Sequence, residues 1–147
     1  MKVLAIASTG GHWTQLLRLL PAFKEHEVVY VSTHHSFAET VRGCKFYAVP
    51  DASRWDKLKL ISMSGAMARI VFTIRPDVVV STGAAPGLVG IILGKAIGAK
   101  TIWVDSIANV DKLSLSGRLA LPFADRVYTQ WQNLATSNII FHGNVLS

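Results

Sequence analysis

The sequence has one cysteine, few acidic residues and no long hydrophobic run. Cys44 alone can form no internal disulfide, which is typical of a protein from a reducing compartment. No stretch of about 18 apolar residues without charge is present, so we expect no membrane-spanning helix. The short apolar N-terminus ends in Ser8-Thr9-Gly10-Gly11 rather than in a cleavage-like site, which favours a first strand over a signal peptide. A cytoplasmic protein is therefore expected.

The shortage of acidic residues leaves 15 Lys and Arg against 9 Asp and Glu, and a net charge of +6. Such an excess attracts polyanions, namely nucleic acid, anionic lipid headgroups or pyrophosphate-containing substrates. Nucleic-acid-binding surfaces usually interleave basic and aromatic residues, whereas the basic residues here stand singly between apolar runs. We therefore favour an anionic membrane or a pyrophosphate ligand, and expect no nucleic-acid partner.

Familiar cofactor motifs are also missing. The G-x-G-x-x-G fingerprint is absent, and His34-His35 stand after the second predicted strand, where an NAD site needs an acidic residue. No Walker lysine follows the glycines near the N-terminus. His12, His34 and His35 have no Cys or carboxylate cluster beside them, and adjacent histidines of an extended chain point in opposite directions. The sequence therefore predicts no bound metal and no cofactor.

What is present is a regular alternation of strands and helices in a chain that is half hydrophobic. Apolar, β-branched runs predict strands at residues 3–7, 28–32, 46–49, 77–81, 100–104, 126–129 and 138–141. Helical spacing predicts helices at residues 12–20, 56–74 and 84–95. This order indicates an α/β fold, a doubly wound, mostly parallel, Rossmann-like sheet covered on both faces. We expect a single domain, residues 1–147.

The loops that follow the strands are the informative ones, because doubly wound proteins bind ligands at the carboxyl ends of their strands. The first loop is Ser8-Thr9-Gly10-Gly11-His12. Its glycines let the backbone approach a ligand, and the following helix offers free N–H groups to a phosphate. An ordinary tight turn explains the glycines equally well. A neutral His12 would be able to accept a hydroxyl proton or to bind a pyrophosphate oxygen.

Two further loops are predicted at the same edge. The second contains Thr82 and Gly83, and its small residues suit either contact with an anion or sugar, or close packing of the next helix. The third begins with Asp105 and Ser106 and includes Asn109. Asp105 is a candidate base or a group that orients a sugar hydroxyl, and Asn109 is a candidate sugar contact. The alternative for Asp105 is a simple helix or turn cap.

These loops belong to an ordered series of motifs that covers nearly the whole chain. The series comprises residues 8–12 with Leu16, and residues 79–83, 103–110, 113–119, 124–125 and 130–131. It resembles the acceptor-binding subunit of the two-part UDP-N-acetylglucosamine transferase that acts on dolichol-linked intermediates, a family that includes bacterial polysaccharide proteins of the PssD type. The Gly-Gly-His turn is also similar to that of the N-terminal lobe of MurG-type enzymes. The resemblance implies the N-terminal half of a GT-B glycosyltransferase.

The resemblance further implies a heterodimer that makes poly- or oligosaccharides. A separate partner subunit binds the UDP-sugar, while this chain binds a polyprenyl-diphosphate-linked sugar acceptor and recruits the partner to the membrane. Transfer is expected to invert the sugar linkage, with His12 and Asp105 as catalytic residues. The residues expected to bind the acceptor are Ser8, Thr9, Gly10, Gly11, Thr82, Gly83, Ser106 and Asn109. Asp105 departs from the family, which usually has a glutamate after this strand.

Eukaryotic members of the family carry an N-terminal membrane helix that this sequence does not show, so attachment to the inner face of the cell membrane is expected to be peripheral. The helix at residues 56–74 combines an apolar face with basic residues, as a membrane-surface helix does, although a core helix has the same pattern. The residues expected to face the membrane are Trp13, Trp55, Lys57, Lys59 and Arg69. Two other hypotheses stay open: a non-catalytic scaffold for a catalytic partner, and a free-standing nucleotide-binding domain.

Overall fold

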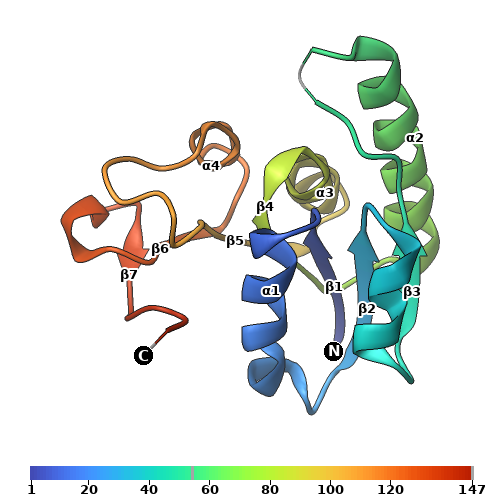
Figure 1. The fold of residues 1–147 in the computed structure, drawn as a ribbon, viewed down its shortest axis with the longest axis horizontal. Coiled ribbons are helices and arrows are strands. Elements are labelled where there is room, and N and C mark those ends of the chain that lie inside the picture. The colour runs from blue at the N-terminus through green and yellow to red at the C-terminus, as the bar shows by residue number, and fades with distance from the viewer. Residues whose placement is uncertain (54, 147) are drawn as a thin grey trace.

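The computed structural model describes residues 1–53 and 55–146, and these build a seven-stranded parallel sheet (Figure 1). Its strands are β1 (Lys2–Ala7), β2 (Glu27–Ser32), β3 (Lys45–Ala48), β4 (Val78–Gly83), β5 (Lys100–Val104), β6 (Arg126–Thr129) and β7 (Ile140–Phe141). Their order across the sheet is β3-β2-β1-β4-β5-β6-β7, and all neighbours pair in parallel. The predicted doubly wound α/β architecture is confirmed.

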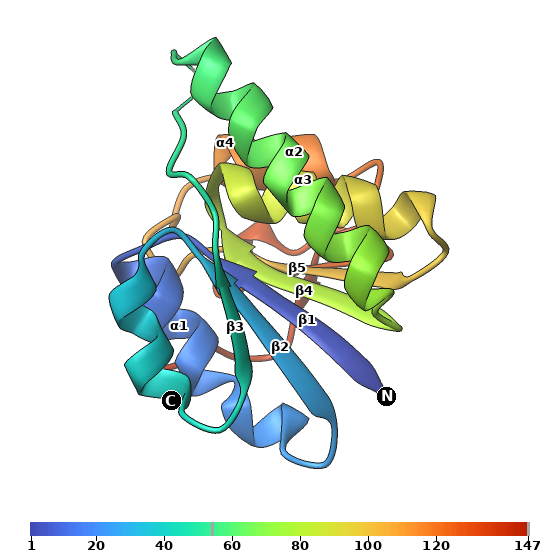
Figure 2. The same cartoon turned by 90° about the vertical axis from the view of Figure 1, so that its right-hand side faces the viewer.

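Helices cover the two faces of this sheet (Figure 2). One face carries α1 (Gly11–Arg18), the 3-10 segments η1 (Leu20–Phe23) and η2 (His35–Val41), and the other carries α2 (Lys57–Ile74), α3 (Ala84–Ala96) and α4 (Leu115–Ala120). A last 3-10 turn, η3 (Gln132–Leu134), precedes β7. The sequence predicted all strands and the three longer helices. It missed α4 and the 3-10 segments, which are too short to show a periodicity.

The strand residues divide the core into two layers. Leu4 and Ile6 face α2 and α3, whereas Val3 and Ala5 face α1. The face of α2 that carries the predicted apolar spacing packs into the first of these layers. Its buried residues are Met63, Met67, Ile70, Val71 and Ile74. The periodicity of residues 56–74 is therefore that of a core helix.

Trp13 belongs to the second layer. Its side chain is only 2% exposed, stacks on Phe37 at a centroid distance of 5.3 Å, and donates from Nε1 to Thr40 Oγ1 at 3.0 Å. The prediction that Trp13 faces a membrane was wrong. The reason is that η2 covers this part of α1. The sequence of η2 shows no periodicity, so this cover was not predicted.

Glycines bring α3 close to the sheet. A Cβ at Gly90 would lie 2.2 Å from Ile6 Cδ1, and one at Gly94 would lie 2.6 Å from Val79 Cγ2. Gly87 lies in the same way against Ser81. Close packing therefore accounts for this part of the small-residue pattern that follows β4.

Asp125 joins α3 to the amino ends of β5 and β6. Its carboxylate accepts hydrogen bonds from Lys95 Nζ at 2.7 Å and from the Thr101 N–H at 2.8 Å. These bonds lower the pKa of Asp125 from 3.8 to about 2, and the bond from Lys95 has the largest effect. The ionised carboxylate fixes the end of the sheet opposite to the predicted site.

Candidate functional site

β1 and β4 lie side by side at the centre of the sheet, and the chain leaves them toward opposite faces. β1 leads into α1 on one face, and β4 leads into α3 on the other (Figure 2). This is the topological switch point, where doubly wound folds bind their ligands. The first and second predicted loops meet there.

His12 connects these two loops. Its ring nitrogen Nδ1 lies 3.1 Å from the carbonyl oxygen of Thr82, and Thr82 Oγ1 donates to the carbonyl oxygen of His12 at 2.6 Å. Thr82 is fully buried, whereas His12 is half-buried in the first turn of α1. The structure thus places an imidazole at the carboxyl edge of the sheet, where residues of the β4 end hold it.

Both helices that begin at this switch point lack a side-chain cap. Gly10 precedes α1 with φ +79°, and Gly83 precedes α3 with φ +150°. The N–H groups and dipoles of uncapped helix N-termini favour an anion. Thr9, Gly10 and Gly11 are exposed beside them, and Ser8 is buried at the end of β1. The first two predicted loops therefore form one polar edge that suits phosphate oxygens.

Asp105 lies at the end of β5 with its carboxylate turned into the protein, where the residue is 1% exposed. The carboxylate accepts from Trp103 Nε1 at 2.9 Å, from Ser114 Oγ at 2.6 Å and from Ser114 N at 3.0 Å. Asn109 Nδ2 donates to it at 3.2 Å. Four donors thus occupy the carboxylate, an arrangement that suits positioning of a loop better than proton transfer.

Residues of α1 and of the segment after β6 also hold the loop that begins at Asp105. Gln15 of α1 donates from Nε2 to the Asp105 carbonyl at 3.0 Å and accepts from the Ile107 N–H at 3.1 Å. Gln130 donates to the same Asp105 carbonyl at 3.3 Å, and Trp131 Nε1 donates to the Ile107 carbonyl at 2.7 Å. Sequence reasoning missed the role of Gln15, although an amide among the leucines of the buried face of α1 was a usable signal.

Ser106 and Asn109 are half-buried on this loop. Ser106 Oγ accepts from the Ala108 N–H at 3.1 Å, and the Asn109 amide is bonded to Asp105. His12 contacts the β4 loop, and Gln15, one turn later on α1, contacts the β5 loop. The three predicted loops are therefore connected through α1.

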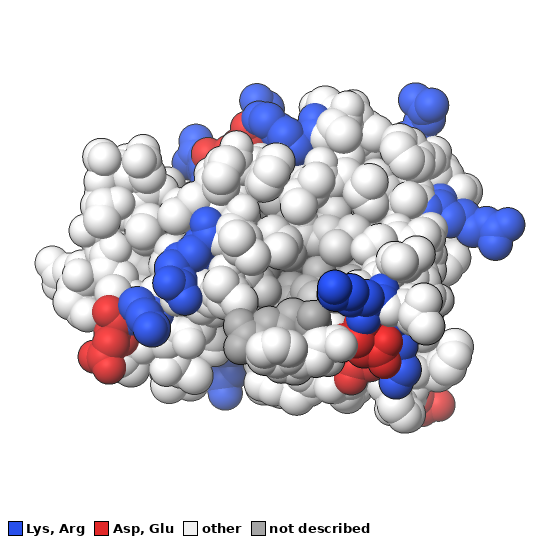
Figure 3. Space-filling view, turned by 90° about the horizontal axis from the view of Figure 1, so that it is seen from above, with Lys and Arg blue, Asp and Glu red and all other residues white. Residues whose placement is uncertain are grey.

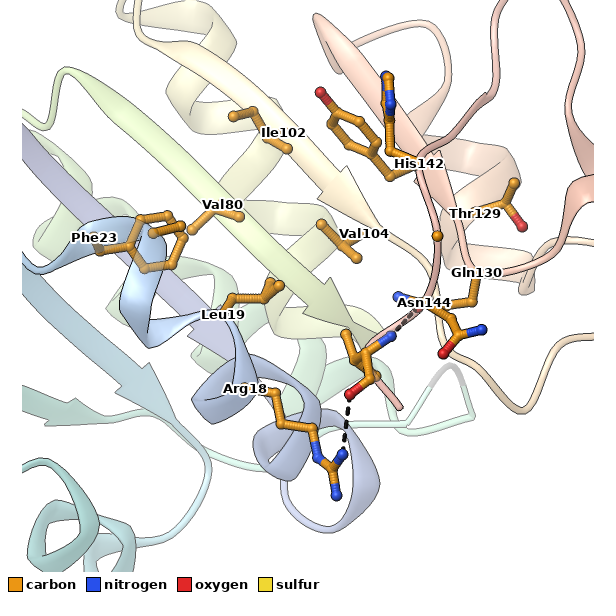
Figure 4. A pocket seen from close by; sticks show the side chains of 14 residues that line it. Arg18, Leu19, Phe23, Val80, Ile102, Val104, Thr129, Gln130, His142 and Asn144 are labelled. Atoms are coloured by element: carbon orange, nitrogen blue, oxygen red, sulfur yellow. Dashed lines mark hydrogen bonds between the residues drawn. The ribbon is translucent and has the colours of Figure 1, made fainter. Parts of the chain in front are cut away.

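A hollow of about 410 Å³ lies on the α1 side of the sheet (Figure 4). Val80, Ile102 and Val104 form its floor, and Leu19 and Phe23 line one wall. The C-terminal segment forms the other wall, where Arg18 Nη1 donates to the Val145 carbonyl at 3.0 Å. The connection from β5 to β6 passes α4 on the opposite face, so no helix of the described residues covers this floor. The apolar pattern of the sequence does not predict this surface.

The amino end of α2 extends beyond the carboxyl edge of the sheet (Figures 1 and 2). Trp55 is 80% exposed, Leu58 81% and Ile61 69%, and Lys57 and Lys59 are exposed between them. The predicted Arg69 is also exposed, further along the helix. Seen from this edge, Lys and Arg side chains are spread around the periphery of the molecule (Figure 3). None of the helices among the described residues has the length and hydropathy to span a bilayer.

The fold places the protein in the class of Rossmann-like α/β domains that GT-B proteins contain. MurG of Acinetobacter baumannii has the same fold with a TM-score of 0.78 at 14% identity, over 95% of this chain and 45% of that one. UDP-N-acetylglucosamine 2-epimerase from Rickettsia bellii gives 0.74 at 13% identity, over 99% and 45%. The chain spans less than half of either structure. The predicted Rossmann-like fold, the one found in the N-terminal half of GT-B proteins, is confirmed.

Residues 52–144 match the family described as "Oligosaccharide biosynthesis protein Alg14 like", and the protein belongs to this family. The UDP-N-acetylglucosamine transferase subunit ALG14 of Candida albicans is 41% identical over 153 residues, which cover 88% of this chain and 70% of that protein. ALG14 of Eremothecium gossypii is 27% identical, with 90% and 74% covered, and human ALG14 is 24% identical, with 91% and 77% covered.

Proposed function

We propose that this protein is the acceptor-binding subunit of a two-part glycosyltransferase. With a partner that binds the donor, it transfers N-acetylglucosamine or another hexose from a UDP-sugar to a sugar carried on a polyprenyl diphosphate. The observation that carries this proposal is the meeting of the Gly-Gly-His turn with the β4 loop at the switch point, between two uncapped helices. The relatives named as transferase subunits support it.

In this proposal the uncapped ends of α1 and α3 bind the diphosphate of the acceptor, since backbone N–H groups and helix dipoles favour anions. Thr9, Gly10 and Gly11 shape the cleft, together with Ser106 on the β5 loop. The imidazole of His12 takes the proton from the acceptor hydroxyl as its oxygen attacks the anomeric carbon. The acceptor oxygen enters on the face opposite UDP, the bond from that carbon to UDP breaks and UDP leaves, so the configuration at the anomeric carbon is inverted. Asp105 holds the β5 loop in place.

In this proposal the donor site belongs to the partner, which the relatives named as transferase subunits support. The experiment is to purify the chain and a donor-binding partner of the same source and to assay each alone and together. Transfer to a short-chain polyprenyl-diphosphate sugar is expected only from the pair. Turnover of a UDP-sugar by this chain alone would contradict the proposal, and tight UDP-sugar binding to it would favour a free-standing nucleotide-binding domain. Activity of the pair would also support the resemblance to bacterial proteins of the PssD type, because it would show that the chain shares their expected function.

We propose that the amino end of α2 contacts the cytoplasmic leaflet. Trp55, Leu58 and Ile61 offer apolar surface where the amino end of α2 extends beyond the carboxyl edge of the sheet. Lys57 and Lys59 lie among them and attract anionic headgroups. This arrangement would hold the cleft toward the bilayer from which a polyprenyl-linked acceptor projects.

Replacing Trp55 and Leu58 together by serine is expected to lower the affinity for vesicles that contain anionic phospholipid at least about tenfold, as measured by co-sedimentation. The reason is that burial of such side chains stabilises by about 1.5–3 kcal/mol each. Phe72→Ser is the matched control, since Phe72 is 51% exposed near the other end of the same helix. Equal losses in both proteins, or none in the double variant, would rule out contact through the amino end of α2.

A further inference from the structure

We infer that Thr82 and Gly83 are positioning residues that give His12 one tautomer, with the proton on Nδ1 and a free lone pair on Nε2. The inference rests on the proposed function for its consequence in catalysis.

Gly83 provides the space in which the imidazole lies. A Cβ at this position would be 2.2 Å from His12 Nδ1, 2.5 Å from Cε1 and 2.9 Å from Cγ. The ring therefore rests directly on the backbone of Gly83. Its φ of +150° is a conformation that L side chains rarely adopt, so both the space and the backbone require glycine here.

Thr82 determines which ring nitrogen carries the proton. Nδ1 lies 3.1 Å from its carbonyl oxygen, and a carbonyl oxygen only accepts hydrogen bonds, so Nδ1 must be the donor. In a neutral imidazole the other nitrogen is then an acceptor. Nε2 lies across the ring from this bond, on the side away from the Thr82 carbonyl. It is the atom available to an acceptor hydroxyl.

The backbone around the ring is fixed by two more bonds. Thr82 Oγ1 donates to the His12 carbonyl at 2.6 Å, which joins β4 to the first turn of α1. Ser81 Oγ accepts from the Gly83 N–H at 3.1 Å, which holds the glycine on which the ring rests. Both ends of His12, main chain and side chain, are thus held by the same loop. A proton acceptor held in this way needs no rearrangement before transfer.

The tautomer can be measured without any activity assay. Two-dimensional ¹H–¹⁵N NMR of the ¹⁵N-labelled protein at a pH of about 8.5, above the usual histidine pKa of about 6.5, distinguishes the two tautomers by their ring-nitrogen shifts. The chain has five histidines, and His12→Gln identifies the signal of interest. We expect a protonated Nδ1 and an unprotonated Nε2. A protonated Nε2 at His12 would overturn the inference, whatever the transferase assay shows.

Variants connect the tautomer to transfer by the reconstituted pair. Gly83→Ala is expected to abolish the Nδ1–H signature and to lower kcat about tenfold to a hundredfold, since misplacement by about 1 Å has effects of that order. Gly65→Ala is the matched control, because Gly65 is exposed on α2 and a Cβ there meets nothing within 4 Å. The four other histidine signals report whether each variant is folded. An unchanged His12 spectrum in a folded Gly83→Ala protein would also overturn the inference.

Thr82 offers a conservative pair. Thr82→Ser keeps the hydroxyl that bonds the His12 carbonyl and should retain the spectrum and most of kcat, whereas Thr82→Val should lose about tenfold of kcat with a smaller change in KM. Equal kcat values for Ser and Val would contradict a positioning role for the hydroxyl. If the tautomer is as inferred but His12→Gln transfers sugar normally, the proposed role of His12 as the base fails while the placement of its ring stands.

Discussion

Replacement of His12 by alanine should lower the rate of sugar transfer by the reconstituted pair by about 10²- to 10⁴-fold, the usual contribution of a general base. The change removes the nitrogen that takes the hydroxyl proton and leaves the uncapped helix ends in place. Binding of the diphosphate-linked acceptor should therefore change little, and the loss should appear in kcat. Initial rates at saturating UDP-sugar, with the acceptor varied, separate the two constants.

Two control variants distinguish chemistry from structure. Thr14→Ala changes an exposed side chain in the same helix, whose hydroxyl makes only a 3.4 Å bond to the Gly10 carbonyl, and should transfer at nearly the normal rate. His12→Gln can still donate to the Thr82 carbonyl but cannot act as a base, so it should be about as inactive as alanine. A loss below about threefold in His12→Ala would favour the non-catalytic scaffold, because it is far less than a general base supplies.

The sequence could predict which loops come together but not how their side chains are used. Parallel strands place their carboxyl ends at one edge, so the loops after β1, β4 and β5 had to meet there once the strands were recognised. The link between His12 and Thr82 depends on β1 and β4 being neighbours, although 70 residues separate them. That adjacency is a property of the strand order, which local periodicity does not contain.

The burial of side chains also depends partly on local sequence patterns and partly on how the elements are arranged in space. The spacing of apolar residues in α2 correctly predicts a helix, and the structure buries that face against the sheet. The exposed apolar end of α2 depends instead on where the helix projects beyond its neighbours, as at Leu58 and Ile61. Trp13 fails for a related reason, since its burial depends on a 3-10 segment that lies more than 20 residues later in the chain.

Of the predicted site residues, Asp105 is the one whose replacement should have the largest effect on stability. In Asp105→Ala the donors of Trp103, Ser114 and Asn109 lose their common acceptor in a buried site. Unsatisfied buried donors cost about 1–3 kcal/mol each, so we expect the free energy of unfolding in urea to fall by about 3–5 kcal/mol. Asp111→Ala, in the exposed part of the same loop, should change it by less than about 0.5 kcal/mol.

The comparison of stability with activity then assigns the role of this carboxylate. If Asp105 positions the β5 loop, transfer by the pair should decline together with the fraction of folded protein, and conditions that stabilise the fold should recover part of it. If Asp105→Ala stays as stable as the unmodified chain but loses transfer by more than about a hundredfold, the carboxylate takes part in the reaction itself. Its four hydrogen-bond donors would then have to be released when the acceptor binds, because a carboxylate that accepts four bonds has no lone pair left for a substrate hydroxyl.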